Sequence, residues 1–485
     1  MTSERLSFDA SVLQQLRDIK QATGLSEVSG DVSPGDVFVA CSQNSEQRQG
    51  HIAQAIQAGA VGLVMDEQME APVNIALPVI RVANLAARRG ILASQFYGDP
   101  TADIECVGIT GTNGKTSIAY HVSDLTNALG KRGGYSGTLG VGFPGSLTLG
   151  SMTTPPPVTL QKHFARFREQ GVERVALEVS SHALDQNRAR DVHFDVGVFS
   201  NLTRDHLDYH QTMEKYAAAK AKMFTTWPLK LAVINADDDM GRNLIGCVRA
   251  SEVLSYGASG DISWRATSVR RGMHVLFDTP WGRLESTLPI AAEFAVANVA
   301  AAIGVLLGSG HAITDLGDAL TRMRTVPGRM EVVPGAYGTP KVVVDYAHTP
   351  DALGKVLTGL AAQCRGRLIC VVGCGGNRDR GKRPEMALMA SNLSDHLWLT
   401  SDNPRDEVPS DILQDMLSGL SVQQRQSVSA VEDRGAAIAQ AVGSASVDDL
   451  VVIAGKGHED TQEIAGVKYP FSDVAHVENI FKESV

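Results

Sequence analysis

The feature that most constrains this 485-residue chain is the segment Gly108-Ile-Thr-Gly-Thr-Asn-Gly-Lys-Thr-Ser117. Residues 104–109 before it predict a short strand, and residues 117–129 after it have apolar positions at helical spacing. A strand, a glycine-rich loop and a helix in that order can surround phosphate with backbone N–H groups and the positive end of the helix. Lys115 would add a charge, and the Thr116 hydroxyl could hold Mg²⁺.

The segment departs from the strict phosphate-loop pattern at one position. That pattern would place its first glycine at position 109, where this chain has Ile109. A chance surface turn is the alternative interpretation, but the flanking strand and helix favour phosphate binding. The predicted nucleotide-binding residues of the loop are Gly111, Thr112, Asn113, Gly114, Lys115, Thr116 and Ser117.

Length and composition limit the possible classes of protein. A chain of 485 residues is too long for one core and predicts two to four domains. The formal net charge of -10 disfavours general nucleic-acid binding. The apolar stretch 291–308 contains Glu293 and Asn298, which favours a buried helix over a membrane span. Six scattered cysteines and an N-terminus without an apolar core predict a reduced, cytoplasmic protein without a signal peptide.

The chain divides into three predicted domains: residues 1–103, 104–330 and 331–485. The first has strand-like segments 37–40, 61–65 and 79–82 and a helical segment 52–58, and the Gly98-Asp-Pro100 turn ends it. In the second, segments 175–179, 196–199 and 231–234 alternate with helical patterns. In the third, segments 341–345, 368–372, 397–400 and 450–454 do the same. This alternation predicts an α/β fold with parallel sheets.

Polar motifs follow the predicted strands, where doubly wound folds place their ligands. In the second domain these are Glu178-Val-Ser-Ser-His182 and the stretch 201–210, whose alternative interpretation is an exposed loop. In the third domain, all four strands end in such a motif. One could be an ordinary loop, but four at successive strand ends indicate a site. These four motifs begin at Asp345, Gly373, Ser401 and Gly455.

The Gly-Thr-Asn-Gly-Lys-Thr loop resembles that of the Mur ligase superfamily, and the motifs of all three domains extend the resemblance over nearly the whole chain. The family joins an amino acid to a carboxylate and uses ATP. The resemblance implies an N-terminal UDP-binding α/β domain, a central P-loop ATPase-like domain and a C-terminal Rossmann-like domain. It also implies the cofactor Mg²⁺, with ATP as a substrate.

The resemblance assigns the catalytic and metal-binding roles. Lys115 would contact ATP, and Thr116 and Glu178 would hold Mg²⁺. His206 would bind a second magnesium ion. Lys220 matches a lysine that the family carbamylates with CO₂, which turns a cation into an anion beside that metal. Without the resemblance, Lys220 would be predicted as a solvated helix lysine.

The same resemblance implies two groups of nucleotide contacts. ATP would also be bound by Asn298, Arg329 and Asp345, although a satisfied core asparagine is the alternative for Asn298. The segment 28–38 resembles a uridine-binding segment in which only Ser29 of the usual Asp-Ser-Arg triplet is kept, and a plain turn is the alternative. The residues implied to bind the UDP-sugar peptide are Ser29, Thr153, Thr154, Ser180, Gln186 and Arg188.

The C-terminal motifs predict the incoming amino acid. Family members with Asp-Asn-Pro-Arg, here Asp402, Asn403, Pro404 and Arg405, select meso-2,6-diaminopimelate, and those that add L-lysine have another sequence there. A guanidinium can bind the distal carboxylate of diaminopimelate through two hydrogen bonds, whereas lysine would leave it unpaired at a cost of about 1.5–3 kcal/mol. The resemblance implies further contacts from Arg378, Gly455 and Glu459.

The implied reaction belongs to cytoplasmic peptidoglycan precursor synthesis, and hence to cell-wall formation. The γ-carboxylate of UDP-N-acetylmuramoyl-L-alanyl-D-glutamate would be phosphorylated by ATP, and the amine of diaminopimelate would then displace phosphate from this acyl phosphate. An L-lysine-adding or other Mur-type ligase is one alternative, and a P-loop switch or motor ATPase is another. A non-catalytic nucleotide-binding protein is disfavoured by the metal and acyl-acceptor candidates. We expect a monomer without nucleic-acid partners or a membrane span.

Overall fold

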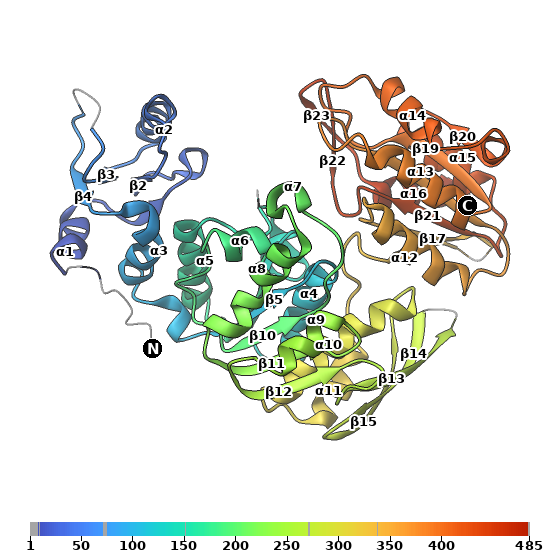
Figure 1. Cartoon of the computed structure of the whole chain (residues 1–485), viewed down its shortest axis with the longest axis horizontal. Coiled ribbons are helices and arrows are strands. Elements are labelled where there is room, and N and C mark those ends of the chain that lie inside the picture. Colours follow the sequence, from blue (N-terminus) through green and yellow to red (C-terminus); the bar gives the residue numbers. More distant parts are fainter. Residues whose placement is uncertain are drawn as a thin grey trace. The chain divides into compact units, whose positions relative to one another are not determined.

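The computed structural model describes residues 8, 10–70, 75–150, 152–269, 272–336 and 338–483 (Figure 1). The chain divides into two compact units. The first unit comprises residues 1–256 and 304–310, and the second comprises residues 257–303 and 311–485. Helix α10 (Val296–Gly308) contributes residues to both. The three boundaries drawn from the sequence, 1–103, 104–330 and 331–485, stay predictions beside this division.

The first unit begins with a four-stranded parallel sheet. Its order is β1-β2-β3-β4, and alternate residues of the strands face opposite sides. Val37 and Val39 pack with helices α1 and α3, whereas Phe38 and Ala40 pack with α2. The elements are α1 (Ala10–Asp18), β1 (Gly24–Ser26), β2 (Asp36–Ala40), α2 (Ser45–Gln57), β3 (Gly62–Asp66), β4 (Val79–Val82) and α3 (Leu85–Phe96).

An eight-stranded sheet forms the rest of the first unit, in the order β12-β11-β10-β5-β9-β6-β7-β8. The first six strands in this order are parallel, and β7 and β8 are antiparallel additions. Helices α5, α6, α8 and α9 share one core with the sheet, and α4 packs on β6 and β9. The strands are β5 (Glu105–Thr110), β6 (Gly133–Gly137), β7 (Gly140–Phe143), β8 (Ser146–Thr148), β9 (Arg174–Glu178), β10 (Val196–Phe199), β11 (Leu229–Asn235) and β12 (Ala250–Tyr256). The helices are α4 (Lys115–Ala128), α5 (Pro157–Glu169), α6 (Ser181–Asp185), α7 (Leu207–His210), α8 (Met213–Thr226) and α9 (Asp239–Ile245).

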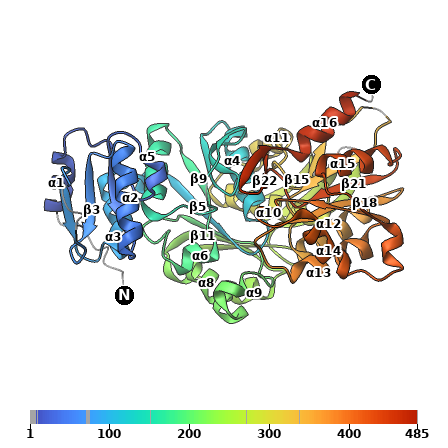
Figure 2. The same cartoon turned by 90° about the horizontal axis from the view of Figure 1, so that it is seen from above.

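The second unit contains a six-stranded sheet in the order β16-β17-β21-β18-β19-β20, parallel except for β16. Helices α12, α13 and α14 share a core with one face, and α15 and α16 share a core with the other. Figure 2 shows strands β18 and β21 between these helix layers. The strands are β16 (Glu331–Val333), β17 (Lys341–Asp345), β18 (Leu368–Cys374), β19 (His396–Ser401), β20 (Val428–Ala430) and β21 (Leu450–Ala454). The helices are α12 (Pro350–Ala361), α13 (Lys382–Leu393), α14 (Pro409–Ser418), α15 (Arg434–Gly443) and α16 (Asp473–Glu483).

Two antiparallel additions of the second unit were not predicted from the sequence. Strands β13 (Ser263–Val269), β14 (Gly272–Thr279) and β15 (Gly282–Leu288) form a separate sheet, against which α11 (Ile313–Leu320) packs. A hairpin of β22 (Thr461–Ile464) and β23 (Val467–Pro470) follows the last strand of the six-stranded sheet. The second of these additions borders the amino-acid motif described below.

The α/β fold class predicted from the sequence is confirmed. The predicted strands 79–82, 196–199, 341–345 and 450–454 coincide with β4, β10, β17 and β21, and the other predicted strands differ by a residue or two at their ends. The apolar stretch 291–308 forms a short 3-10 turn followed by the largely buried α10. Among the described residues, no helix is long and apolar enough to cross a membrane.

Candidate active site

The phosphate-binding loop lies between β5 and α4, as the sequence predicts. Gly111 and Gly114 have φ angles of 145° and 85°, which favour glycine. A Cβ atom at Gly111 would lie 1.8 Å from the Ser200 hydroxyl, so the loop passes too close to the end of β10 for any side chain. The backbone N–H of Thr112 donates to the Asn201 carbonyl at 2.8 Å. These glycines therefore serve both the turn and its close packing.

The segment after β10 fixes the rest of the loop. The Asn113 N–H donates to the Asn201 side-chain oxygen at 2.9 Å, and the Ser200 hydroxyl donates to the Asn113 carbonyl at 2.6 Å. The Lys115 ammonium lies on the loop itself, within 3.0 Å of the Gly111 carbonyl. A fixed loop with a lysine folded over it at the start of a helix is suited to bind polyphosphate.

Glu178 is a fully buried carboxylate at the end of β9 and adjoins this loop. Thr116, the second residue of α4, donates its hydroxyl to Glu178 Oε2 at 2.9 Å. The hydroxyl of Tyr135 and the N–H and hydroxyl of Thr138 also donate to the carboxylate. Gly137 makes room for it, because a Cβ there would lie 2.2 Å from Glu178 Oε1. Thr116 and Glu178 thus lie within hydrogen-bond distance of each other, and their predicted role in holding Mg²⁺ stays a prediction.

Lys220 is buried on α8, contrary to the solvated lysine expected from the helix pattern alone. Its ammonium donates to the Gly111 carbonyl at 2.7 Å and lies 4.5 Å from the centre of the Tyr216 ring. Burial, and then the neighbouring charge of Lys115, lowers the pKa of Lys220 well below its usual range. A larger fraction of neutral amine, which is the form that reacts with CO₂, follows from this shift.

His206 directly precedes α7 and has a left-handed conformation with φ 52°. Its ring lies 5.0 Å from that of His182 and 6.1 Å from that of Tyr216, measured between ring centres. Burial lowers the pKa of His206, with a smaller opposing effect from Asp205. A neutral imidazole beside the buried lysine helix is a suitable metal ligand.

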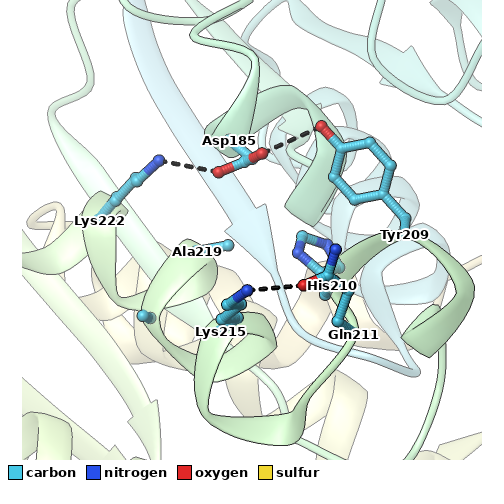
Figure 3. A pocket seen from close by; sticks show the side chains of 8 residues that line it. Asp185, Tyr209, His210, Gln211, Lys215, Ala219 and Lys222 are labelled. Atoms are coloured by element: carbon cyan, nitrogen blue, oxygen red, sulfur yellow. Dashed lines mark hydrogen bonds and ion pairs between the residues drawn. The ribbon is translucent and has the colours of Figure 1, made fainter.

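A surface cavity of about 480 Å³ is lined by residues of α6, α7 and α8. Figure 3 shows Lys222 paired with Asp185 across it, and Lys215 paired with Gln211. Neither Lys220 nor any residue of the loop 111–117 is among its lining residues, so the cavity is distinct from the predicted phosphate site. Its lining residues are Asp185, Tyr209, His210, Gln211, Lys215, Ala218, Ala219 and Lys222.

The residues implied to bind the UDP-sugar peptide form one network, except Ser29. Thr154 donates to the Glu178 backbone carbonyl at 2.8 Å and accepts from the Ser180 N–H at 3.0 Å. Arg188 donates to the Thr154 carbonyl and to the Gln186 side chain. Thr153 contacts this group through the Thr138 hydroxyl at 3.1 Å. Ser29 lies in the four-stranded part of the unit, where its hydroxyl donates to Gln54.

In the second unit, Gly375 lies where the predicted amino-acid contacts meet. A Cβ atom there would lie 2.9 Å from Arg405 Nη1, 3.8 Å from Arg378 Cγ and 3.8 Å from the Asn403 carbonyl oxygen. The Arg405 guanidinium donates to the Gly376 carbonyl at 2.8 Å. Gly455 similarly approaches the buried Asp402 carboxylate. The motifs after β18, β19 and β21, including Pro404, therefore lie together, and their contacts with an amino acid stay a prediction.

A buried lysine missed by the sequence analysis supports this cluster. Lys456 is fully buried and donates to Asn403 Oδ1, Glu459 Oε2 and the Thr461 carbonyl at 2.7–3.2 Å. Asn403 also donates to Glu459 Oε2 at 2.7 Å. The sequence did offer one indication of Lys456, which lies between two glycines in the motif that begins at Gly455. Lys456 therefore orients the side chains of Asn403 and Glu459, two of the predicted amino-acid contacts.

The structure brings together only some of the residues of the second unit that are predicted to contact ATP. Asp345 ends β17 and accepts N–H bonds from Met330 and Ala347 at 2.7 and 2.8 Å. Burial raises the pKa of Asp345, and the Arg329 charge opposes this. The Arg329 guanidinium lies 4.4 Å from the Tyr346 ring centre. Asn298 is half-buried on α10, a different element, and its adenine role stays a prediction.

Together these features define a class of protein: an enzyme with a P-loop nucleotide site in one α/β unit and a Rossmann-like binding site in another. Family models agree. The Mur ligase middle domain matches residues 109–306, and the Mur ligase glutamate ligase domain matches residues 328–457. The chain belongs to the Mur ligase family of ATP-dependent amide ligases.

Curated relatives are similar over most of their length. The UDP-N-acetylmuramoyl-L-alanyl-D-glutamate–2,6-diaminopimelate ligase of Pseudomonas syringae pv. tomato is 45% identical, with 92% of each chain covered. The enzyme of the same name from Coxiella burnetii is 43% identical, covering 96% of this chain and 99% of the relative. A solved structure with this name has a TM-score of 0.65 at 34% identity, with 95% of both chains covered. The MurF ligase of Thermotoga maritima in complex with ADP shares the fold, with a TM-score of 0.69 at 18% identity and coverage of 96% and 98%.

The donors around Glu178 fit the magnesium that the family implies. The carboxylate and the Thr116 hydroxyl are hard oxygen donors, which Mg²⁺ prefers, and the carboxylate is buried beside a phosphate loop. Among the described residues, no group of three or more His, Cys, Asp or Glu side chains is arranged to hold a metal. Mg²⁺ at nucleotide sites is usually bound by one or two carboxylates together with substrate phosphates and water.

Proposed function

We propose that this Mur ligase adds meso-2,6-diaminopimelate to the D-glutamate γ-carboxylate of UDP-N-acetylmuramoyl-L-alanyl-D-glutamate. ATP is consumed to ADP and phosphate through an acyl phosphate, in peptidoglycan precursor synthesis in the cytoplasm. The observation that carries the proposal is the convergence of Arg378, Asn403 and Arg405 around Gly375. Relatives that bear this substrate in their name agree with it.

Arginine chemistry explains the choice of amino acid. The distal carboxylate of diaminopimelate can accept two hydrogen bonds from the Arg405 guanidinium. The Glu459 carboxylate, oriented by Lys456 and Asn403, can accept a hydrogen bond from an ammonium group of the same amino acid. An amino acid with an ammonium and a carboxylate at its distal end therefore matches the charges of the site.

In the first unit, the chain's own residues position the phosphate donor and the acid. The loop from Gly111 to Gly114 and the Lys115 ammonium bind the phosphates of ATP, and Thr154, Ser180 and Arg188 hold the substrate peptide. Both groups meet at Glu178: Thr116 contacts its carboxylate and Thr154 its backbone carbonyl. Because carboxylate and triphosphate repel each other, positioning and charge neutralisation carry most of the catalysis.

Two features of the proposal concern charge. Thr116 and Glu178 would hold one Mg²⁺, and His206 with carbamylated Lys220 would hold a second; bound magnesium neutralises phosphate charge. The lowered pKa of Lys220 supports carbamylation, since the neutral amine is the nucleophile for CO₂. A carbamate replaces the buried cation by an anion that suits a neighbouring metal.

The decisive experiment is a phosphate-release assay with purified protein, Mg²⁺, ATP, the UDP-muramoyl dipeptide and a panel of amino acids. Phosphate release that requires both the dipeptide and diaminopimelate, with the tripeptide product identified by mass, supports the proposal. Turnover with L-lysine and not with diaminopimelate would establish the lysine-adding alternative. Phosphate release without the dipeptide would contradict a ligase.

A further inference from the structure

The hairpin of β22 and β23 holds in place the tetrapeptide Asp402-Asn-Pro-Arg405, the proposed binding motif for the incoming amino acid. The side chain of Gln462 donates to the Asp402 carbonyl at 2.8 Å. The Glu463 N–H donates to Asn403 Oδ1 at 3.0 Å, and the Arg405 N–H donates to the Glu463 carbonyl at 2.9 Å. Arg405 has a left-handed φ of 54°, a strained conformation that these contacts hold in place. The backbone of Glu463 thus fixes the tetrapeptide at two points.

The side chain of Glu463 approaches the same arginine. Its Oε2 lies 3.8 Å from Arg405 Nε, and the two side chains are 32% and 23% exposed. The guanidinium therefore has an anionic partner within the protein, in addition to the Gly376 carbonyl. A distance of 3.8 Å is too long for a hydrogen bond but close enough for charge attraction. A substrate carboxylate could displace such a loose partner.

We propose that Glu463 is a specificity-determining residue: its carboxylate competes with the distal carboxylate of the amino acid for Arg405. This inference rests on the proposed function and concerns the same site. When diaminopimelate binds, two carboxylates share one guanidinium, and their repulsion weakens binding. When lysine binds, Arg405 keeps Glu463 as its partner and is not left unpaired. Glu463 therefore lowers the ratio of kcat/KM for diaminopimelate to kcat/KM for lysine.

The expected effect is modest because the pair is partly exposed. Ion pairs of this kind contribute little, so Glu463→Gln should lower the KM for diaminopimelate by roughly two- to five-fold. The KM for ATP should stay unchanged, and the kcat/KM ratio of diaminopimelate to lysine should rise by a similar factor. Glutamine keeps the length of the side chain and the backbone contacts of residue 463, and an unchanged Tm would confirm that the fold is intact.

Asp460→Asn is the matched control. Asp460 is exposed, lies three residues before Glu463, and its replacement removes the same charge. Equal changes of KM in Asp460→Asn and Glu463→Gln would overturn the inference in favour of a general charge effect. A raised KM for diaminopimelate in Glu463→Gln would also overturn it, because Glu463 would then assist binding.

A double-mutant cycle tests the route through Arg405. In an Arg405→Ala background, Glu463→Gln should leave the KM for diaminopimelate unchanged, since the contested partner is gone. A persisting effect would contradict competition for Arg405. Failure of the wild-type enzyme to add diaminopimelate would refute the proposed function itself, whereas a working enzyme with no response to Glu463→Gln would refute only this inference.

Discussion

The Lys220 ammonium donates a 2.7 Å hydrogen bond to the carbonyl oxygen of Gly111, 109 residues earlier in the chain. A buried lysine on α8 is thereby attached to the first residue of the phosphate loop. Burial and the nearby Lys115 charge lower the pKa of Lys220, so more of the amine is in the neutral form that reacts with CO₂. The geometry joins the proposed modification to the phosphate site.

The first prediction follows from this contact. Lys220→Ala should remove most activity, by a factor of about 100 or more, because the anion expected beside the second metal is lost. Small carboxylic acids such as acetate should partly restore the rate, which a phosphate-release assay would measure. The control is Lys222→Ala on the same helix, where the side chain is exposed and paired with Asp185. An active Lys220→Ala enzyme would remove the carbamate from the mechanism.

Replacement of Arg405 tests whether this side chain recognises the incoming amino acid. Arg405→Ala should raise the KM for diaminopimelate about 10- to 100-fold, because a charged hydrogen-bond partner contributes about 1.5–3 kcal/mol. The KM for ATP should change little. Arg380→Ala removes an exposed arginine of the same unit and serves as the control. Equal changes of both KM values in the Arg405 variant would mean that the tetrapeptide does not select the amino acid.

Variants of Glu178 and Tyr135 separate the effect of the carboxylate charge on activity from the effect of its hydrogen bonds on stability. Glu178→Gln removes the carboxylate expected to hold magnesium and introduces an amide that mismatches the donors Tyr135 and Thr138. Activity should fall at least 100-fold, with about 1–3 kcal/mol of lost stability. Tyr135→Phe deletes one donor to the same carboxylate and should lose stability while keeping most activity. Steady-state rates and urea unfolding of both variants measure the two effects. Similar activity losses in both would contradict a metal role for Glu178.

The parallel strands and the motifs at their ends were predictable because buried parallel strands are short apolar runs and their carboxyl ends share one edge of a sheet. Strands such as β17 and β21 show this directly. The sheet formed by β13, β14 and β15 was missed, although the alternation of buried Leu284, Ser286 and Leu288 is a strand signal. Half-exposed strands with many polar residues lack the continuous apolar run that the analysis relied on.

The site was predictable only as far as its motifs. The loop pattern indicated Lys115, and the family resemblance implied the roles of Glu178 and Arg405, but neither indicated the residues that hold them. Tyr135 reaches Glu178 from a neighbouring strand, and Glu463 reaches Arg405 from a hairpin 58 residues later in the chain. Such contacts depend on sheet order and loop path, which a single sequence does not specify. Burial of Lys220 likewise follows from the packing of α8 and not from its helical pattern.

A pH-dependent prediction concerns Glu407. Two hydrogen bonds from the buried Arg383, and one from the Asn377 N–H, lower the pKa of Glu407 to about 2. Because the folded pKa lies below the unfolded value, this group stabilises the fold above about pH 4.5 and loses that effect as the pH falls toward 2. Glu407→Gln should therefore be less stable than wild type at pH 7. Urea unfolding from pH 7 to pH 3 should show the difference shrinking below pH 4.5, and a constant difference would contradict the assignment.

The buried pair of Arg434 and Asp473 gives the strongest stability prediction. Both side chains are fully buried, and Arg434 Nε and Nη2 lie 2.7 Å from the two carboxylate oxygens of Asp473, joining the first residues of α15 and α16. Arg434→Ala leaves a buried carboxylate unpaired and should cost about 3–5 kcal/mol in urea unfolding. Lys355→Ala, in an exposed pair with Asp351, should cost less than about 0.5 kcal/mol. The double variant Arg434→Met with Asp473→Leu should be more stable than Arg434→Ala, because it does not leave the Asp473 charge buried without its partner. The single variants Arg434→Met and Asp473→Leu complete the comparison. If the double variant loses as much free energy of unfolding as these two single variants added together, the two charges act independently, and the ion pair does not link the two helices.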